Sequence, residues 1–308
     1  MQNAESNEPT SSLVNDLLKE KRADRRWKNI RFIAWFCFLV FVFLNLTGTF
    51  NNLPVPASAS GSKYTALIRL DGMIAPGRGF SAQDVIPTLQ EAFADKHAAG
   101  VLIDINSPGG TPVQSSIIHD AILMLKKKYH KKVIIVGEDL LTSGAYFVAV
   151  AADKIYVNPN TLTGSVGVIM KGFGFVDVMK KVGIERRVYT SGDEKDRLDP
   201  FLPQSPDDAK KVQEVMNEVH QNFEAAVIAG RKGKLHADPK TLFNGDFWSG
   251  QSALKLGLVD GLGNLQDVME KEFNTSEYRE YGGTSNLFKM IGSQLGSAFD
   301  AVFYSSPL

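Results

Sequence analysis

Cysteine is almost absent from this chain of 308 residues. Its single cysteine, Cys37, lies in an apolar stretch near the N-terminus. The rest of the chain therefore has no disulfide, no thiolate metal site and no cysteine nucleophile. Metal-ligand spacings, glycine-rich phosphate loops and dinucleotide-binding fingerprints are missing as well. We therefore expect neither a metal nor a cofactor.

An excess of charge of one sign is also missing. Lys+Arg and Asp+Glu both number 34, so the formal net charge is zero. This balance gives no indication of a nucleic-acid-binding surface, and no nucleic-acid partner is expected. The chain downstream of the N-terminal segment, roughly 220 residues, is long enough to bury a full core as one α/β domain.

Long apolar runs are confined to one place. Residues 32–44 read FIAWFCFLVFVFL, and extension through residue 50 gives about 19 residues, near the length that a bilayer helix requires. Lysine and arginine are frequent before this run, and the next basic residue after it is Lys63. The asymmetry predicts a cytoplasmic basic N-terminus (1–31), a transmembrane signal anchor (32–50), a linker (51–63) and a main domain outside the cytoplasm.

A cleaved signal peptide is the competing interpretation of this run. Ala57-Ser58-Ala59 resembles a cleavage site, but it lies far beyond Leu44, and the basic region is unusually long. A buried core helix is a second alternative, disfavoured by an uninterrupted apolar run directly behind a basic block. We favour the uncleaved anchor.

Short apolar strands then alternate with helices. We expect strands at 64–70, 101–105, 133–136, 154–157, 166–170 and 185–189, and helices at 83–94, 115–127, 145–152, 175–182 and 207–231. The alternation predicts an α/β fold with mainly parallel strands, in a domain spanning 64–275. The C-terminal tail, 276–308, contains an amphipathic helical pattern from Ser285 to Phe303. Its nearly uncharged polar face favours packing on the body or on a neighbouring subunit over membrane binding.

Ser143 stands where an apolar strand gives way to a helical run of small residues. A serine at such a junction exposes its hydroxyl beside the free N–H groups of the new helix, as a nucleophile that generates an oxyanion requires. Asn106-Ser107-Pro108-Gly109-Gly110 occupies a second strand-to-helix corner. The N–H groups of Gly109 or Gly110 and of Gly144 are candidates for an oxyanion hole. A helix cap and a tight turn are the plain structural alternatives.

Lys195 is a candidate base for a serine–lysine pair, which needs no histidine. A lysine accepts a proton only when it is removed from water or held by neutral acceptors. Its acidic neighbours Asp193, Glu194 and Asp196 equally fit a charged surface loop. Ser165, in a glycine-bracketed turn, is a candidate for orienting the lysine amine. A Ser–His–Asp triad stays open but has little support, because the histidines all lie in expected helices or polar, lysine-rich surroundings: His97, His119, His130, His220 and His236.

Taken together, these segments resemble the short, single-domain form of the signal peptide peptidase A family (SppA, or protease IV). The resemblance covers about residues 64 to 273. It is carried by the order and spacing of Asn106–Gly110, Thr142–Tyr146, Ala151–Ile155, Leu162–Val168, Ser191–Asp196, Pro200-Phe201 and Ala253–Asp260. Two departures fall beside the serine: Ala145 replaces a glycine common in the family, and Phe147 a frequent tyrosine.

The resemblance implies a ClpP/crotonase-like fold of repeated ββα units preceded by one transmembrane helix. It implies Ser143 as nucleophile, Lys195 as general base, Ser165 as the hydroxyl that orients the lysine, and backbone N–H groups of Gly109 or Gly110 and of Gly144 as the oxyanion hole. Family members form bowl-shaped homo-oligomers, octamers in the single-domain form, in which adjacent protomers supply the serine and the lysine.

The function implied is that of a serine endopeptidase at the bacterial inner membrane. Its substrates would be cleaved signal peptides and other short hydrophobic peptides. A catalytically silent peptide-binding scaffold of the same fold is one alternative, disfavoured by the intact Ser143, Lys195 and Ser165. A crotonase-type acyl-CoA enzyme is another, and it explains neither the anchor nor Lys195.

Overall fold

The computed structural model describes residues 27–42 and 63–282. The chain divides into two compact units, Met1–Gly61 and Ser62–Leu308. In the first unit, residues 27–42 form a helix with exposed apolar side chains. None of the described helices is both long enough and apolar enough to span a bilayer. Most of the expected basic N-terminus, the end of the expected anchor, the cleavage-site alternative at 57–59, nearly all of the linker and the amphipathic tail pattern lie outside the described residues.

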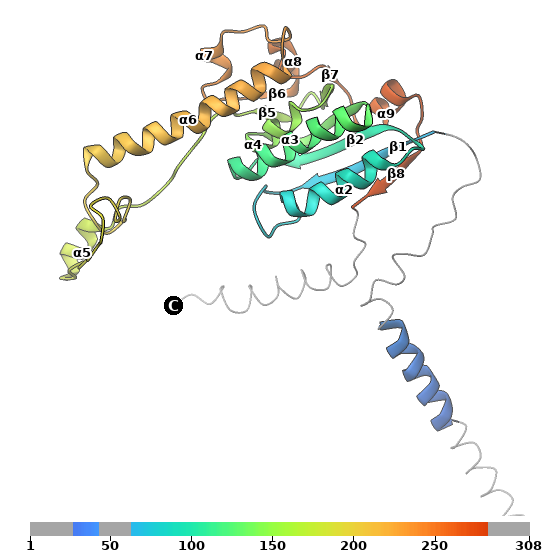
Figure 1. Ribbon diagram of the computed structural model, residues 1–308, viewed down its shortest axis with the longest axis horizontal. Helices are drawn as coiled ribbons and strands as arrows, with labels where there is room; N and C mark the ends of the chain where they lie inside the picture. The colour runs from blue at the N-terminus through green and yellow to red at the C-terminus, as the bar shows by residue number, and fades with distance from the viewer. Residues whose placement is uncertain (1–26, 43–62, 283–308) are drawn as a thin grey trace, which may run out of the picture. The chain divides into compact units, whose positions relative to one another are not determined.

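The second unit is built on one sheet, which has eight strands among the described residues (Figure 1). The strands are β1 (Tyr64–Asp71), β2 (Ala98–Ser107), β3 (Val133–Thr142), β4 (Lys154–Val157), β5 (Leu162–Gly164), β6 (Phe247–Ser249), β7 (Gly261–Leu262) and β8 (Tyr278–Tyr281). Their order is β6-β5-β3-β2-β1-β8, with β4 beside β3 and β7 beside β4. Each of these pairings is parallel except that of β5 with β6. The mixed α/β fold with mainly parallel strands is thus confirmed.

Helices cover both faces of the sheet. The helices of this unit are α2 (Ala82–Ala94), α3 (Pro112–Tyr129), α4 (Gly144–Ala149), α5 (Val176–Val182), α6 (Pro206–Gly230), α7 (Pro239–Leu242), α8 (Gly250–Leu256) and α9 (Leu265–Phe273). Ile68, Ile103 and Ile135 face the core under α2 and α3, whereas Leu102 and Ile134 face α9. Because alternate side chains on both faces are buried, the strands read as continuous apolar runs.

Strand β3 directs the chain to the point where the site lies. Its first half pairs with β4, up to Gly137↔Val157, and its last three residues pair with β5, up to Thr142↔Gly164. On its other side β3 pairs with β2, up to Ser107↔Leu141. The carboxyl ends of β2, β3 and β5 therefore lie side by side.

Two expected strands are wrong. Residues 166–170 form no strand, and the strand of this region is β5, which ends at Gly164. Gly164 and Ser165 both have positive φ, 96° and 52°, which breaks the extended path there. Residues 185–189 form no strand either, because they follow α5, away from the sheet, where no strand edge is available for pairing (Figure 1). The other expected strands and helices are confirmed, with shifts at their ends.

Candidate active site

Ser143 has a backbone conformation that residues with side chains rarely adopt. It joins β3 to α4 with φ 52° and ψ −124°. Such a conformation costs about 1–3 kcal/mol and persists where the surrounding structure holds it. Here the N–H of Ser143 donates to the carbonyl of Gly164 on the neighbouring strand, at 2.8 Å. The sharp turn exposes the hydroxyl at the end of the sheet, as in strand–turn–helix nucleophile elbows.

Three glycines next to Ser143, at positions 109, 110 and 144, are packed so closely by their neighbours that none leaves room for a side chain. Gly109 has φ 98°, and a Cβ placed on it would lie 2.8 Å from the Cβ of Ser143 and 2.7 Å from the N of Gly144. A Cβ on Gly144 would lie 3.1 Å from the N of Gly110 and 2.4 Å from the Oγ of Ser115. The two strand-to-helix corners singled out in the sequence therefore meet in space.

The hydrogen bonds of these glycines differ. The N–H of Gly109 donates to the Oγ of Ser107 at 3.1 Å. Within the described part of the chain, the N–H groups of Gly110 and Gly144 have no acceptor. Gly110 and Gly144 line the same pocket as Ser143. Gly110 and Gly144 thus offer two free donors beside a serine, the arrangement that stabilises an oxyanion, whereas the Gly109 donor is already occupied.

Ser165 also lies at this end of the sheet. It follows Gly164, whose pairing with Thr142 places Ser143 and Ser165 directly after neighbouring positions of adjacent strands. Its φ is 52°, and its N–H donates to the carbonyl of Asp246 at 2.7 Å. The structure therefore brings together Ser143, Ser165 and the three glycines.

Lys195 lies elsewhere. It is exposed in the loop between α5 and α6, in a shallow hollow with Arg186, Asp196 and Phe201. We call residues 170–205 the arm; α5, which is part of it, lies at the end of α6 that is remote from the sheet (Figure 1). One copy of the chain therefore does not bring Lys195 to Ser143.

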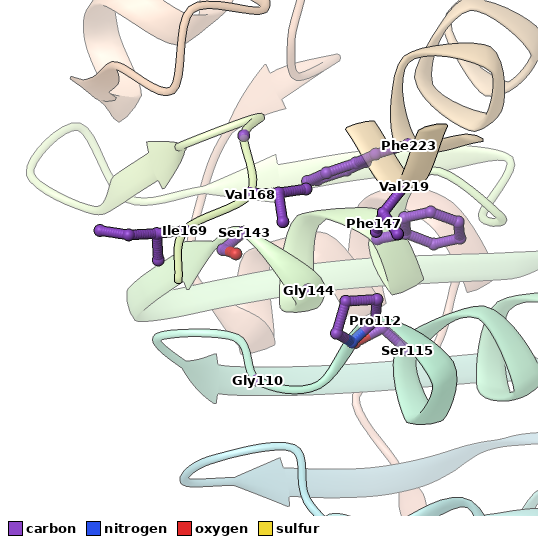
Figure 2. Close-up of a pocket in the computed structure, with 11 residues that line it drawn as sticks. Gly110, Pro112, Ser115, Ser143, Gly144, Phe147, Val168, Ile169, Val219 and Phe223 are labelled. Carbon is purple, nitrogen blue, oxygen red and sulfur yellow. The ribbon is translucent and has the colours of Figure 1, made fainter. Parts of the chain in front are cut away.

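A small pocket of about 110 Å³ opens beside the serine (Figure 2). Besides Ser143 and its glycines it is lined by mostly apolar side chains: Pro112, Ser115, Phe147, Val168, Ile169, Val219 and Phe223. Most of these lining residues are not predicted from the sequence. Val219 and Phe223 could have been predicted as neighbours on one face, because they stand at i and i+4 on the apolar face of α6. No sequence pattern places Val168 and Ile169 there, since they lie in irregular chain.

None of the histidines lines this pocket. The ring of His119 packs edge-on against the pocket residue Phe147 with centroids 5.2 Å apart, and its Nδ1 lies 2.8 Å from Asp120. His130 ends α3 in a left-handed conformation, and His97 is exposed. The described geometry therefore gives a histidine base no support. In the part of the chain that the structure describes, no cluster of three acidic, histidine or cysteine side chains could hold a metal ion.

Asp104 is a buried acid near this end of the sheet that the sequence analysis passed over. Its side chain, 3% exposed, meets Arg69 at 2.5 Å, while its Oδ1 has no partner among the described residues. Removal from water, and then the negative charge of Glu138, raise the pKa of Asp104 to about 7 against the opposing effect of Arg69. This carboxyl therefore titrates near neutral pH.

Comparison with known proteins identifies the family of this chain. The sequence profile of Peptidase family S49 matches residues 125–277, which include Ser143, Ser165 and Lys195. A protein of Methanocaldococcus jannaschii, provisionally named a protease, is 31% identical over 244 residues, which make up 76% of this chain and 77% of that protein. The chain belongs to peptidase family S49.

Further relatives of this S49 protein carry other names. A protein of Enterococcus faecium, provisionally named signal peptide peptidase SppA, is 30% identical over 214 residues, or 68% of this chain and 62% of that protein. A Brucella abortus protein named Na(+)/H(+) antiporter NhaA is 43% identical over 213 residues. The match covers 67% of this chain but only 29% of the Brucella protein. The chain thus spans less than a third of that relative, and the transport activity in its name is not carried over.

Proposed function

We propose that this S49 protein is a serine endopeptidase with Ser143 as its nucleophile. The observation that carries the proposal is the set of two free N–H groups, on Gly110 and Gly144, beside a serine held at positive φ. A helix cap would need neither the strained serine nor the second glycine corner. The apolar pocket next to Ser143 would hold an apolar side chain of the substrate, which fits short hydrophobic peptides such as cleaved signal peptides.

Lys195 of a second copy of the chain would act as the general base. Two features support this arrangement. Lys195 does not line the Ser143 pocket of its own copy and lies in a separate hollow with Phe201, and the arm that carries it exposes large apolar side chains: Met170, Phe173, Val178, Val182, Ile184 and Tyr189. Packing of the arm against a neighbour would cover these side chains and remove Lys195 from water. We propose a homo-oligomer, with the octamer of the SppA family as its expected form.

The chemistry then follows in two steps. The neutral amine of Lys195 takes the proton of the Ser143 hydroxyl as its Oγ attacks the peptide carbonyl, and Gly110 and Gly144 donate to the oxyanion. The protonated lysine gives its proton to the leaving amine, which leaves an acyl-enzyme on Ser143. The lysine next takes a proton from water as that water attacks the ester, and it returns this proton to the Oγ of Ser143 as the acyl–oxygen bond breaks and the acid product leaves. Ser165 would accept a hydrogen bond from the lysine amine and orient it.

The N-terminal segment would hold the peptidase at a membrane. Its apolar run, 32–50, follows a basic block, and the described part of that run is a helix with exposed apolar side chains. We propose a single-pass anchor in the inner membrane of a bacterium, with the N-terminus in the cytoplasm and the peptidase domain outside it. Tethering would raise the enzyme concentration where membrane-derived peptides appear.

The test is cleavage of a fluorogenic hydrophobic peptide by the full chain in detergent. Ser143→Ala and Lys195→Ala should each be inactive, whereas Lys180→Ala, which removes another arm lysine, should be active. When the two inactive variants are co-expressed, a shared site predicts that roughly a quarter of the sites are complete, because serine and lysine then come from different copies.

No recovery on co-expression would place both groups in one copy and overturn the shared site. Near-normal activity of either single variant would overturn the serine–lysine mechanism. If the unmodified chain also binds hydrophobic peptides without cleaving them, the scaffold interpretation replaces the peptidase, and binding of coenzyme A would favour the acyl-CoA alternative.

A further inference from the structure

Four exposed lysines gather at the edge of the sheet where the parallel strands begin. Lys63 precedes β1, Lys96 precedes β2, and Lys127 and Lys128 lie in the last turn of α3, which ends at the same edge. The starts of β1 and β2 are adjacent, since Tyr64 pairs with Ala98. None of the four lysines has an acidic partner among the described residues. We call these four residues the basic edge.

Most acids at this edge are already engaged. Asp95 accepts hydrogen bonds from two tyrosines, Glu272 bonds to two further lysines, and Asp153 pairs with a lysine of α3. Glu91 and Glu270 are exposed on the nearby turns of α2 and α9, and Glu277 is exposed directly before β8, which starts beside β1. The C-terminal end of α3 carries a partial negative charge of about half an elementary charge, so it offsets only a small part of the positive charge of Lys127 and Lys128. The basic edge therefore keeps a positive surplus.

The opposite edge of the sheet has the opposite sign. Exposed acids stand where the strands end, near the candidate site: Asp71, Glu138, Asp139 and Glu280. Arg69 lies 3.9 Å from Glu138 and 3.6 Å from Glu280 and offsets one of these negative charges. The charge of a chain with zero net charge is thus separated along the strand direction in this unit. An anionic surface would attract one edge and repel the other.

The chain path brings the basic edge near the proposed membrane. Lys63 directly follows the segment that joins the apolar run to β1. The residues between the run and Lys63, 51–62, span at most about 40 Å when fully extended and about 20 Å as a flexible coil. At the coil length of about 20 Å, the edge at which the chain enters the sheet would lie nearer the lipid surface than the opposite edge, which is about 30 Å further along the strands.

We propose that the basic edge binds anionic phospholipid headgroups of the membrane that holds the N-terminal segment, and so orients the peptidase domain. The inference rests on the proposed anchor. A sheet standing on this edge carries Ser143 about 30 Å above the headgroups, because the ten residues of β3 rise about 3.3 Å each. A peptide substrate would then have to leave the bilayer before Ser143 could cleave it.

The test measures sedimentation of residues 62–308 with lipid vesicles, because this unit has its own core and lacks the apolar run. Vesicles of phosphatidylcholine are compared with vesicles containing about one third phosphatidylglycerol, at low salt and at about 0.5 M NaCl, where screening is nearly complete. We expect binding to the anionic vesicles alone, lost at high salt. Equal binding to both vesicles, or binding that salt does not weaken, would overturn the proposal.

A pair of charge reversals locates the surface. Lys127→Glu with Lys128→Glu should weaken anionic-vesicle binding by roughly fivefold or more for each lysine. The matched control is Lys240→Glu with Lys255→Glu, which reverses two exposed lysines of α7 and α8. Equal weakening by both pairs would contradict a defined surface. Circular dichroism checks that both variants fold, and the salt comparison needs no variant.

The peptidase assay separates this proposal from the proposed function. The full-length Lys127→Glu, Lys128→Glu variant should cleave a soluble peptide in detergent at the unmodified rate, because neither lysine lies at the Ser143 pocket. Loss of peptidase activity in every form of the protein, with vesicle binding intact, would remove the proposed function and leave the lipid surface standing.

Discussion

At the scale of single residues, the site depends on backbone positions that exclude side chains. Ser143 turns sharply only because Gly109 leaves space against its Cβ and against the N of Gly144. Gly110 forms an isolated parallel β-bridge with Ile74, but the hydrogen bonds of this bridge are made by its neighbours. The N–H of Ile74 donates to the carbonyl of Gly109, and the N–H of Thr111 donates to the carbonyl of Ile74, so the N–H of Gly110 stays free. A single methyl group at this corner should therefore affect the proposed reaction more than it affects the fold.

Replacement of Gly109 by alanine tests this. The new Cβ would lie within 2.8 Å of two site atoms, so we expect peptide cleavage to fall about 100-fold or more, the size of effect seen when an oxyanion donor is lost. Gly77→Ala is the matched control, since Gly77 also has positive φ (71°) but open space around it. Both variants should lose about 1–2 kcal/mol of stability from backbone strain, and Gly109→Ala should lose more, because its Cβ would meet backbone atoms of Thr142 and Gly144. Equal activity of the two would show that the corner is not part of the site.

Asp104 makes stability depend on pH near neutrality. Its pKa is raised to about 7 in the folded state from an ordinary value near 3.8, so between these values the folded chain binds more protons than the unfolded chain. The free energy of unfolding should therefore fall as pH rises from 5 to 7, by up to about 1.4 kcal/mol per pH unit from this group. Asp104→Asn should flatten that slope in denaturant titrations. An unchanged slope would show that Asp104 stays ionised throughout this range.

At the scale of elements, the loop between α8 and β7 holds α4 and the end of α6 together. Tyr146 of α4 donates to the carbonyl of Leu258 at 2.6 Å. Arg231, which is fully buried after α6, donates to the carbonyl of Gly257 and to Asp260. Since α4 begins at Gly144 and α6 lines the pocket, this loop positions both walls of the candidate site.

Removal of the buried cation should cost far more than removal of an exposed one. Arg231→Met leaves Asp260 with a lost partner and should lower the free energy of unfolding by about 3 kcal/mol. Lys234 binds the same carboxylate but is 39% exposed, so Lys234→Met should cost less than about 1 kcal/mol. Denaturant unfolding measures both losses in free energy of unfolding. Similar losses for the two variants would show that burial does not strengthen the contribution of the Arg231–Asp260 pair.

At the scale of the whole molecule, the arm is the part whose apolar side chains and Lys195 do not contribute to the candidate site of their own copy. It carries large exposed apolar side chains, among them Phe173 at 80% and Tyr189 at 92% exposure, and it carries Lys195. Apolar patches of this kind usually mark an interface. Assembly and activity should therefore rise and fall together in this protein.

Charges placed on the apolar side of α5 should separate the copies. Val178 and Val182 are exposed and lie one helical turn apart, so Val178→Glu with Val182→Glu should yield smaller species with at least 100-fold less peptide cleavage. Lys180→Gln with Lys181→Gln, on the same helix, should keep size and activity. Light scattering and the peptide assay measure the two properties. A small species with full activity would contradict a site shared between copies.

The sequence by itself determined the α/β class, most of the elements and the meeting of Ser143 with the glycine corner. These follow from local rules: apolar strands buried on both faces, helix signals, and the parallel order that gathers strand ends at one edge. The expected strands at 166–170 and 185–189 are wrong. Positive φ at Gly164 and Ser165 breaks the extended path before the first, and the second has no strand edge to pair with, which an apolar pattern alone does not supply.

Tertiary structure decided the rest. In the folded chain the N–H of Gly109 donates to Ser107, whereas the N–H groups of Gly110 and Gly144 stay free. Which N–H groups stay free depends on the backbone direction at the corner between β2 and α3. It brought α6 against α4 to form the pocket, and it kept Lys195 away from Ser143. Each of these outcomes depends on contacts between segments distant along the chain, which residue types and spacing do not encode.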